Sequence, residues 1–277
     1  MSYLKTFLLL TLLTGIFLLI GFIWAGTFGM TIFFLTALVF NFTTYWYSDK
    51  IVLAMYGAKE IKKDENPKLH EIVKKLCREA KIPKPKIYRI NLPVPNAFAT
   101  GRDTKHSAIA VSDSLLKSLN EDEIEGVLAH EISHIKNKDM LIATLAATIA
   151  GAIAYIAQIA WYSIFFSQRR NENLLFLPLL FLAPLAATLI KLAISRNEEF
   201  KADKDGALIS KKPLALASAL EKISKIAETK PIQGNAATSH LFIVNPFKTD
   251  SFVKLFSTHP PVEERIKRLK DLAKELK

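Results

Sequence analysis

The chain has 277 residues and a mass of 31.1 kDa, half of its residues are hydrophobic, and its mean hydropathy is +0.20. This composition excludes an ordinary cytosolic globule, because three runs that lack Asp, Glu, Lys, Arg and His are as long as membrane spans: Thr6–Ser48, Met140–Gln168 and Asn173–Ile190. The net charge of +11 comes from basic residues interspersed with acids, without a basic arm, so no nucleic-acid partner is expected.

The first apolar run predicts a transmembrane hairpin over residues 1–48. The segment Ala25–Gly29 interrupts the run and leaves two helices, Leu4–Trp24 and about Met30–Tyr47, joined by a tight turn. A cleavable signal peptide is the alternative. It is disfavoured because a second apolar span follows within a few residues and because the basic start of the chain consists of Lys5 alone.

Residues 49–139 form a charged block, the first part of a water-facing domain. Its pattern predicts a helix that starts at Asn66-Pro67 and ends before Pro83, a strand at Lys86–Ile90, a hairpin of Asn96–Gly101 with Ser107–Val111, and a helix with Asn120 as its N-cap. The acids that follow Asn120 suit the positive end of a helix dipole.

Residues 140–190 predict a second hairpin, and residues 191–277 predict the second part of the water-facing domain. The second hairpin is less regular than the first, because Asn173–Ile190 is short and contains Pro178 and Pro184. The last block predicts helices at about Ser195–Ser210, Pro213–Glu228 and Pro261–Leu276.

Lys and Arg near the span ends predict the orientation. Eleven of them flank the ends that face the two charged blocks, whereas only Arg169 and Arg170 flank the other side. We therefore expect the two charged blocks and both termini to lie in the cytoplasm.

The segment His130-Glu131-Ile132-Ser133-His134 is a His-Glu-x-x-His motif. Residues four apart lie on one face of a helix, so His130 and His134 can hold one metal ion while Glu131 lies beside it. Zinc with an open coordination position acidifies water, and a neighbouring carboxylate can accept the proton, which is the chemistry of peptide hydrolysis. The alternative is a structural pair of histidines on an ordinary helix.

A third metal ligand is required, and the candidate segment is Ser195–Asp203. Glu199 and Asp203 lie four residues apart, so their carboxylates share one helix face: the first can bind zinc and the second can orient a ligand histidine. Glu198 faces a different direction. Taken alone, these acids also fit a solvent-exposed helix.

Together these segments resemble the HtpX family of membrane-bound zinc metalloproteases, relatives of the enzymes that process prenylated CAAX proteins. The resemblance rests on Asn96–Gly101, Glu123–Asp139, Ser195–Asp203, His240–Pro246 and Ser257–Ile266, which occur in the family's order. With the two apolar hairpins, it covers nearly the whole chain. It implies one Zn²⁺ per chain held by His130, His134 and Glu199, with Glu131 as general base and Asp203 supporting a ligand.

The resemblance also implies roles for residues outside the motif. The strand that contains Asn96, Ala97, Phe98 and Ala99 would pair with an extended substrate, with a plain structural hairpin as the alternative. His259 and Arg265 would stabilise the tetrahedral oxyanion. For these two residues the alternative is structural, with His259 capping the last helix and Arg265 pairing with an acid.

The sequence thus predicts a mainly α integral membrane protein with four transmembrane helices and a zincin-like α+β cytoplasmic domain that has a small β-sheet. The resemblance implies an endopeptidase of the plasma or inner membrane that acts on misfolded or damaged membrane proteins, with proteins or peptides and the lipid bilayer as partners. The alternatives are a non-catalytic zinc-binding membrane scaffold, a prenyl-protein protease and an intramembrane protease. Charges around the His motif disfavour the last, and the presence of Glu131 disfavours a scaffold.

Overall fold

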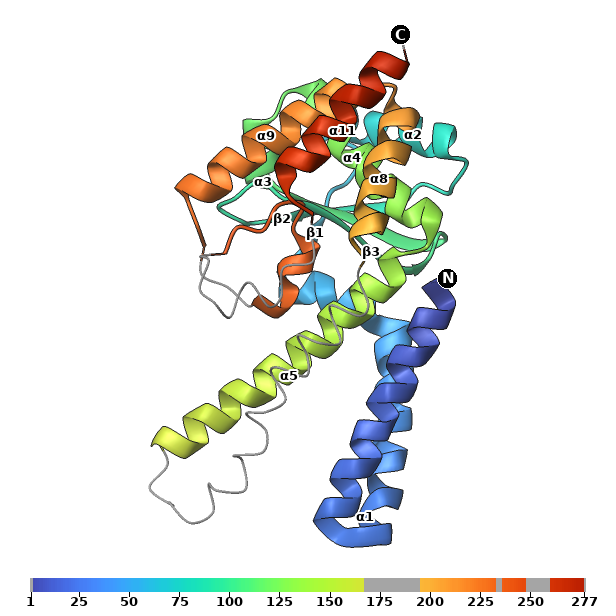
Figure 1. Ribbon diagram of the computed structural model, residues 1–277, viewed down its shortest axis with the longest axis vertical. Helices are drawn as coiled ribbons and strands as arrows, with labels where there is room; N and C mark the ends of the chain where they lie inside the picture. Colours follow the sequence, from blue (N-terminus) through green and yellow to red (C-terminus); the bar gives the residue numbers. More distant parts are fainter. Residues whose placement is uncertain (1, 167–194, 233–235, 248–259, 277) are drawn as a thin grey trace.

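The computed structural model describes residues 2–166, 195–232, 236–247 and 260–276. The helices are α1 (Ser2–Met55), α2 (Pro67–Ala80), α3 (Asp113–Ser118), α4 (Glu121–Asn137), α5 (Met140–Phe166), α8 (Arg196–Ser210), α9 (Pro213–Thr229), the 3-10 helix η2 (Ala236–Leu241) and α11 (Val262–Glu275). The strands are β1 (Lys59–Glu60), β2 (Lys86–Ile90), β3 (Ala97–Asp103) and β4 (His106–Ser112). Figure 1 shows α1 and α5 projecting from one side of a mixed α/β domain that the other elements build.

Helix α1 is a hairpin of two arms, as Figure 1 shows. Its helical backbone is broken at Ala25 and Gly26, and Gly26 has a φ of 59°, in the left-handed region that favours glycine. The arms pack through aromatic rings, with the Phe17 centroid 6.3 Å from that of Phe33 and 5.8 Å from that of Phe40. The turn therefore lies inside the segment that the sequence predicts.

Helix α1 is long and apolar enough to cross a membrane. Its most apolar 18-residue window has a mean hydropathy of 2.5, and only 22% of that window is buried. The helix continues past the expected boundary at residue 48 to Met55. The apolar helix α5 packs beside the first arm, where Leu9 and Leu13 lie against Leu141, Ile142 and Leu145. The expected span at residues 173–190 lies outside the described residues.

The sheet is small and mixed, in the order β1-β2-β4-β3. Strands β2 and β4 are parallel, with Ile87 opposite Ile109, whereas β1 pairs with β2 and β3 pairs with β4 in antiparallel fashion. The sequence predicts β2 and the β3–β4 hairpin correctly and misses β1, which has only two residues. Among the described residues, β3 lies at the end of the sheet, and one of its edges pairs with no strand.

Helix α4 is the centre of the domain and is buried between β3 and the helices α2, α8 and α9. It begins with a capping box, in which Asn120 accepts a hydrogen bond from the Glu123 N–H and Glu123 accepts one from the Asn120 N–H, each at 2.9 Å. Its apolar side chains Val127, Leu128 and Ile132 have no exposed surface. Burial on several sides fixes this helix firmly in the core.

Helix α8 crosses α4 at very close range because small residues line the contact. A Cβ atom on Gly206 would lie only 2.8 Å from the backbone nitrogen of His130 and 3.0 Å from the carbonyl carbon of Ala129. Nearby, the Ser133 hydroxyl donates to the carbonyl of Ala202 at 3.1 Å. The backbone of α8 therefore touches that of α4 at His130.

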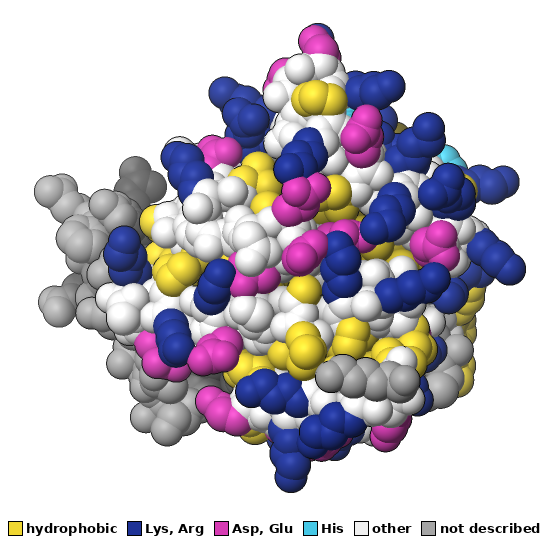
Figure 2. All heavy atoms as spheres, turned by 90° about the horizontal axis from the view of Figure 1, so that it is seen from above, with side chains coloured by type: hydrophobic (Ala, Val, Ile, Leu, Met, Phe, Trp, Pro, Cys, Tyr) yellow, Lys and Arg dark blue, Asp and Glu magenta, His cyan; other side chains and the backbone are white. Residues whose placement is uncertain are grey.

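The charged residues of the domain cover the face opposite to α1 and α5. Figure 2 views that face and shows Lys and Arg side chains scattered among Asp and Glu, without one uniform patch. The distribution matches the expectation that the positive net charge is dispersed over the water-facing domain.

We predict that Gly206→Ala lowers the free energy of unfolding by about 1–3 kcal/mol, because the added methyl group forces α8 away from α4. Thermal unfolding in detergent measures the loss. Gly15→Ala is the control, since a Cβ at Gly15 meets no atom within 4 Å. Equal unfolding midpoints for the two variants would show that the close contact has no energetic role.

Candidate metal centre

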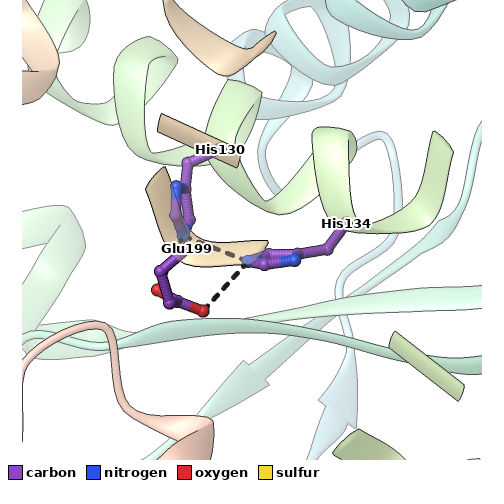
Figure 3. Close-up of side chains that lie close together, drawn as sticks. All are labelled: His130, His134 and Glu199. Atoms are coloured by element: carbon purple, nitrogen blue, oxygen red, sulfur yellow. Dashed lines mark hydrogen bonds and ion pairs between the residues drawn. The ribbon is translucent and has the colours of Figure 1, made fainter. Parts of the chain in front are cut away.

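Two histidines of α4 point their ring nitrogens at each other. His130 and His134 lie one helical turn apart, and their Nε2 atoms are 3.2 Å from each other (Figure 3). The side chain of His130 is 2% exposed and that of His134 is 16% exposed. Two neutral imidazoles that face each other in this way leave a nitrogen lone pair in the centre, which favours a bound proton or metal ion.

Glu199 of α8 completes a set of three donors. Its carboxylate oxygens lie 3.6 Å from Nε2 of His134 and 3.8 Å from Nε2 of His130 (Figure 3). Within the described residues, this is the one group of three His, Cys, Asp or Glu side chains able to hold a metal ion, and its donor atoms all lie within 4.8 Å of one another.

The spacing of these atoms fits zinc. Tetrahedral zinc with nitrogen ligands at about 2.0–2.1 Å separates two such nitrogens by roughly 3.3 Å. The observed separation of 3.2 Å between the Nε2 atoms of His130 and His134 is close to that value. Two imidazoles and one carboxylate also leave a fourth position open, which is the arrangement of catalytic rather than structural zinc sites.

Glu198 lies next to Glu199 in the chain but turns to other partners. Its Oε2 accepts a hydrogen bond from the backbone N–H of Ser195 at 3.3 Å, in a capping box at the start of α8. Its Oε1 accepts one from Nζ of Lys5 at 2.6 Å. The structure thus places Glu199, and not Glu198, beside the two histidines, as the helical phase predicts.

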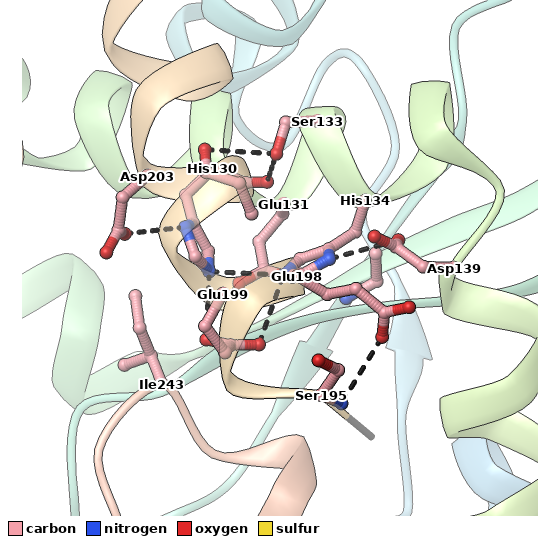
Figure 4. A network of polar contacts seen from close by, with 12 residues as sticks. His130, Glu131, Ser133, His134, Asp139, Ser195, Glu198, Glu199, Asp203 and Ile243 are labelled. Carbon is pink, nitrogen blue, oxygen red and sulfur yellow. Dashed lines mark hydrogen bonds and ion pairs between the residues drawn. The ribbon is translucent and has the colours of Figure 1, made fainter. Parts of the chain in front are cut away.

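Asp203 lies one turn after Glu199 on α8 and contacts the far side of the His130 ring. Its Oδ1 is 3.0 Å from Nδ1 of His130 (Figure 4). Burial alone would raise the pKa of Asp203, but the Arg265 guanidinium outweighs it and the pKa is lowered, so the group is a carboxylate. A carboxylate at Nδ1 fixes the imidazole so that Nε2 points into the donor set.

Arg265 of α11 is fully buried and pairs with Asp203. Its Nε and Nη2 atoms donate to the two carboxylate oxygens at 2.7 and 2.8 Å, and its Nη1 donates to the carbonyl of Ile243 at 2.9 Å. Nη1 is also 3.7 Å from Oε2 of Glu199. Pairing with an acid is the alternative that the sequence leaves open for Arg265. The other expected oxyanion residue, His259, lies outside the described residues.

Asp139 supports the second histidine, a role that the sequence motifs did not predict. Its Oδ1 is 3.0 Å from Nδ1 of His134. Burial lowers the pKa of His134, but Asp139 and then Glu199 and Glu131 outweigh it and raise the pKa to about 10. The surrounding acids therefore favour a positive charge at or beside this ring. The signal in the sequence is an acid five residues after His134, at the point where α4 ends.

The side chain of Glu131 extends from α4 to the edge strand β3. It is 5% exposed, and its Oε2 accepts a hydrogen bond from the Ala99 N–H at 2.8 Å. Burial raises the pKa of Glu131, and the charges of His130 and His134 offset this effect only in part. A carboxylate with a raised pKa accepts a proton more readily, as general-base catalysis requires.

The free edge of β3 faces the metal centre. The Ala99 N–H points toward Glu131 and away from β4, and because backbone groups alternate along a strand, Ala97 turns the same way. The ring of Phe98 packs against the ring of Tyr56, at 5.3 Å between centroids. Of the expected substrate-binding residues, Ala97 and Ala99 thus present backbone groups to the site.

The side chain of Asn96 forms hydrogen bonds with the backbone of the segment Leu241–Ile243. Its Nδ2 donates to the carbonyl of Leu241 at 3.2 Å, and its Oδ1 accepts from the N–H of Ile243 at 3.1 Å. This amide is fully buried. It holds Leu241–Ile243 across the cleft from the edge of β3, a positional role that the sequence analysis did not foresee.

The cleft beside the donor set is narrow, with a cavity volume of about 50 Å³, and both ionisable and apolar residues line it. Its apolar lining includes Ala97, Phe98, Ile142, Leu241, Phe242 and Ile243. His240 also lines it and lies 3.1 Å from the carbonyl of Ala143 through Nε2. Because Ile142 and Ala143 belong to α5, the first turns of an apolar helix form part of the cleft.

Comparisons with known proteins agree on one family. The sequence profile of peptidase family M48 matches residues 63–273. A "Protease HtpX homolog" of Sulfurihydrogenibium sp. is 52% identical, over 99% of this chain and 97% of that protein. A second, from Pyrococcus furiosus, is 51% identical over the same shares.

A solved structure shares the fold. The crystal structure of S. mikatae Ste24p aligns with a TM-score of 0.51 at 18% identity, over 96% of this chain. The match spans 65% of the Ste24p chain, slightly less than two thirds of its length. At this identity the likeness concerns the fold alone.

We predict that Glu199→Gln strips the metal or weakens its binding severely, because an amide is a much poorer ligand than a carboxylate. Asp203→Asn should cost roughly 10–100-fold in metal affinity, whereas Glu198→Gln should retain one equivalent. Atomic absorption on the purified variants measures the metal. Retention in Glu199→Gln together with loss in Glu198→Gln would reverse the ligand assignment.

Proposed function

Because the chain belongs to peptidase family M48 and is a metalloendopeptidase, we propose that it hydrolyses peptide bonds with one zinc ion held by His130, His134 and Glu199. The observation that supports this proposal best is the convergence of these three side chains beside the buried carboxylate of Glu131. When bound, zinc supplies a Lewis acid that acidifies water and polarises the scissile carbonyl.

Glu131 is the general base in this proposal. It follows His130 directly on α4, so it lies at the donor set without being one of the donors. Its raised pKa suits a group that takes a proton from the attacking water and returns it to the leaving amine. The hydrogen bond from the Ala99 N–H holds the carboxylate at the cleft edge.

The edge of β3 is the proposed substrate strand. An extended peptide can add to a free strand edge through its backbone, whatever its side chains are. Glu131 uses the N–H of Ala99, which leaves the carbonyl of Ala99 and both backbone groups of Ala97 for the substrate. Asn96 contributes indirectly, since it holds the opposite wall at Leu241–Ile243.

Arg265 acts as a positioning residue in this arrangement. It neutralises Asp203, which orients His130, and its third donor holds the carbonyl of Ile243 in the wall. The oxyanion role that the resemblance implies would require its guanidinium to turn away from these partners. His259 keeps its proposed oxyanion role from the resemblance alone.

We propose that the substrates are membrane proteins, misfolded or damaged ones in particular, and that the enzyme acts in membrane protein quality control. The apolar lining of the cleft and its continuity with α5 support unfolded, apolar segments near the membrane surface as substrates. The site itself lies in the charged domain, and charges as close as Lys136 and Asp139 are too costly for the bilayer interior. Cleavage of peptide bonds outside the hydrocarbon region therefore fits better than intramembrane cleavage.

We propose a multi-pass topology in the plasma or inner membrane, with four spans and a cytoplasmic catalytic domain. Reporters placed after Lys62 and at Lys277 should both read cytoplasmic, because Lys and Arg favour that side. A reporter at Asn171 should read external if the second hairpin spans. An external signal after Lys62 would overturn the orientation.

The central test combines activity and metal content. The purified protein should digest an unfolded protein such as casein, lose activity with a zinc chelator and regain it with zinc. Glu131→Gln should keep one zinc but lose about 10²–10⁴ in rate, because an amide cannot accept the proton. Glu121→Gln, an exposed acid in the first turn of the same helix, is the control. Normal turnover by Glu131→Gln with zinc bound would refute the base assignment.

A further inference from the structure

We propose that Lys5, in the first membrane arm, is a positioning residue of the metal centre. Through its ion pair with Glu198 it holds the first turn of α8, and with it the adjacent ligand Glu199, against the histidines of α4. This inference rests on the proposed zinc site and gives the membrane hairpin a part in building that site. The hairpin would then be more than an anchor.

Lys5 is the only charged side chain among residues 2–48. A single lysine at the start of a span is usually explained by membrane orientation, with its ammonium group in water. Here Nζ lies 2.6 Å from Oε1 of Glu198, 193 residues further along the chain. The two side chains are only 23% and 24% exposed, so the pair is shielded more than an ordinary surface ion pair.

Glu198 has two tasks at once. One carboxylate oxygen accepts the N–H of Ser195 and caps α8, and the other accepts the ammonium of Lys5. Because Glu198 and Glu199 are neighbours in the first turn, a displacement of that turn moves both carboxylates. The ammonium group of Lys5 therefore restrains the backbone turn that carries the metal ligand Glu199.

Helix α8 is held on both sides of Glu199. On the C-terminal side, Arg265 forms two hydrogen bonds with Asp203. On the N-terminal side, Lys5 of α1 donates a hydrogen bond to Glu198. Functional sites tolerate displacements of only about 0.5 Å. Loss of either contact would let one end of this short segment shift.

Lys5 is itself fixed against the helices that form the site. Leu9 and Leu13, one and two turns further along the arm, are 6% and 4% exposed and pack on the start of α5. The ring of Tyr3 lies 5.8 Å from Nζ of Lys138, at the end of α4. The first arm thus has a defined position relative to α4, which a positioning role requires.

The test uses the full-length protein in detergent, with Lys5→Met, Glu198→Gln, the double variant and Lys5→Arg. Zinc affinity is measured by competition with a chelator, and the visible spectrum of the Co²⁺-substituted protein reports ligand geometry. Lys50→Met is the matched control, because Lys50 lies on the second arm of the hairpin, with Nζ 5.2 Å from the centroid of the Tyr47 ring.

We expect each single variant to raise the zinc dissociation constant roughly 3–10-fold and to alter the Co²⁺ spectrum. The double variant should be no weaker than the weaker single variant, and Lys5→Arg should restore wild-type affinity. Unchanged affinity and spectrum in Lys5→Met, additive losses in the double variant, or an equal loss in Lys50→Met would overturn the inference. A wild-type protein that binds no zinc would instead refute the proposed function.

Discussion

At Gly206, helix α8 lies so close to α4 that a single methyl group would collide with the backbone of His130. This contact sets the distance between the two elements that present the donors, two histidines on one helix and Glu199 on the other. A larger residue at this position would separate the helices, and the carboxylate would no longer reach the imidazoles. The metal centre thus depends on backbone packing before it depends on any ligand.

Close packing buries several charged side chains around the donor set. Each of them is paired with a partner through a chain of polar contacts. Arg265 neutralises Asp203, Asp203 orients His130, and Asp139 supports His134. A buried guanidinium without its carboxylate would be very costly, so these residues must be present together. The same network places Ile243 in the cleft wall, and therefore links the stability of the core to the shape of the cleft.

Local physics explains which parts of this structure the sequence predicts. Three predicted features depend only on neighbours in the chain, and all three appear in the structure. They are the cap at Asn120, the alternation of the β3–β4 hairpin and the four-residue spacing of His130 and His134. The sequence does not predict the partners of Asn96 and Arg265, because 145 and 62 residues separate these side chains from the groups that they bind. A single sequence shows that such side chains are present but not what they contact.

The apolar helix α5 joins the charged domain at the site itself. Helix α5 follows α4 after a short turn, and its first residues line the cleft while the following turns pack on the first arm of α1. A tilt of this helix would move Ile142 and Ala143 in the cleft as well as the arm that places Lys5. The apolar helices α1 and α5 are therefore mechanically coupled to the donor set. Under the proposed function, an apolar substrate segment would meet the cleft where α5 enters the domain.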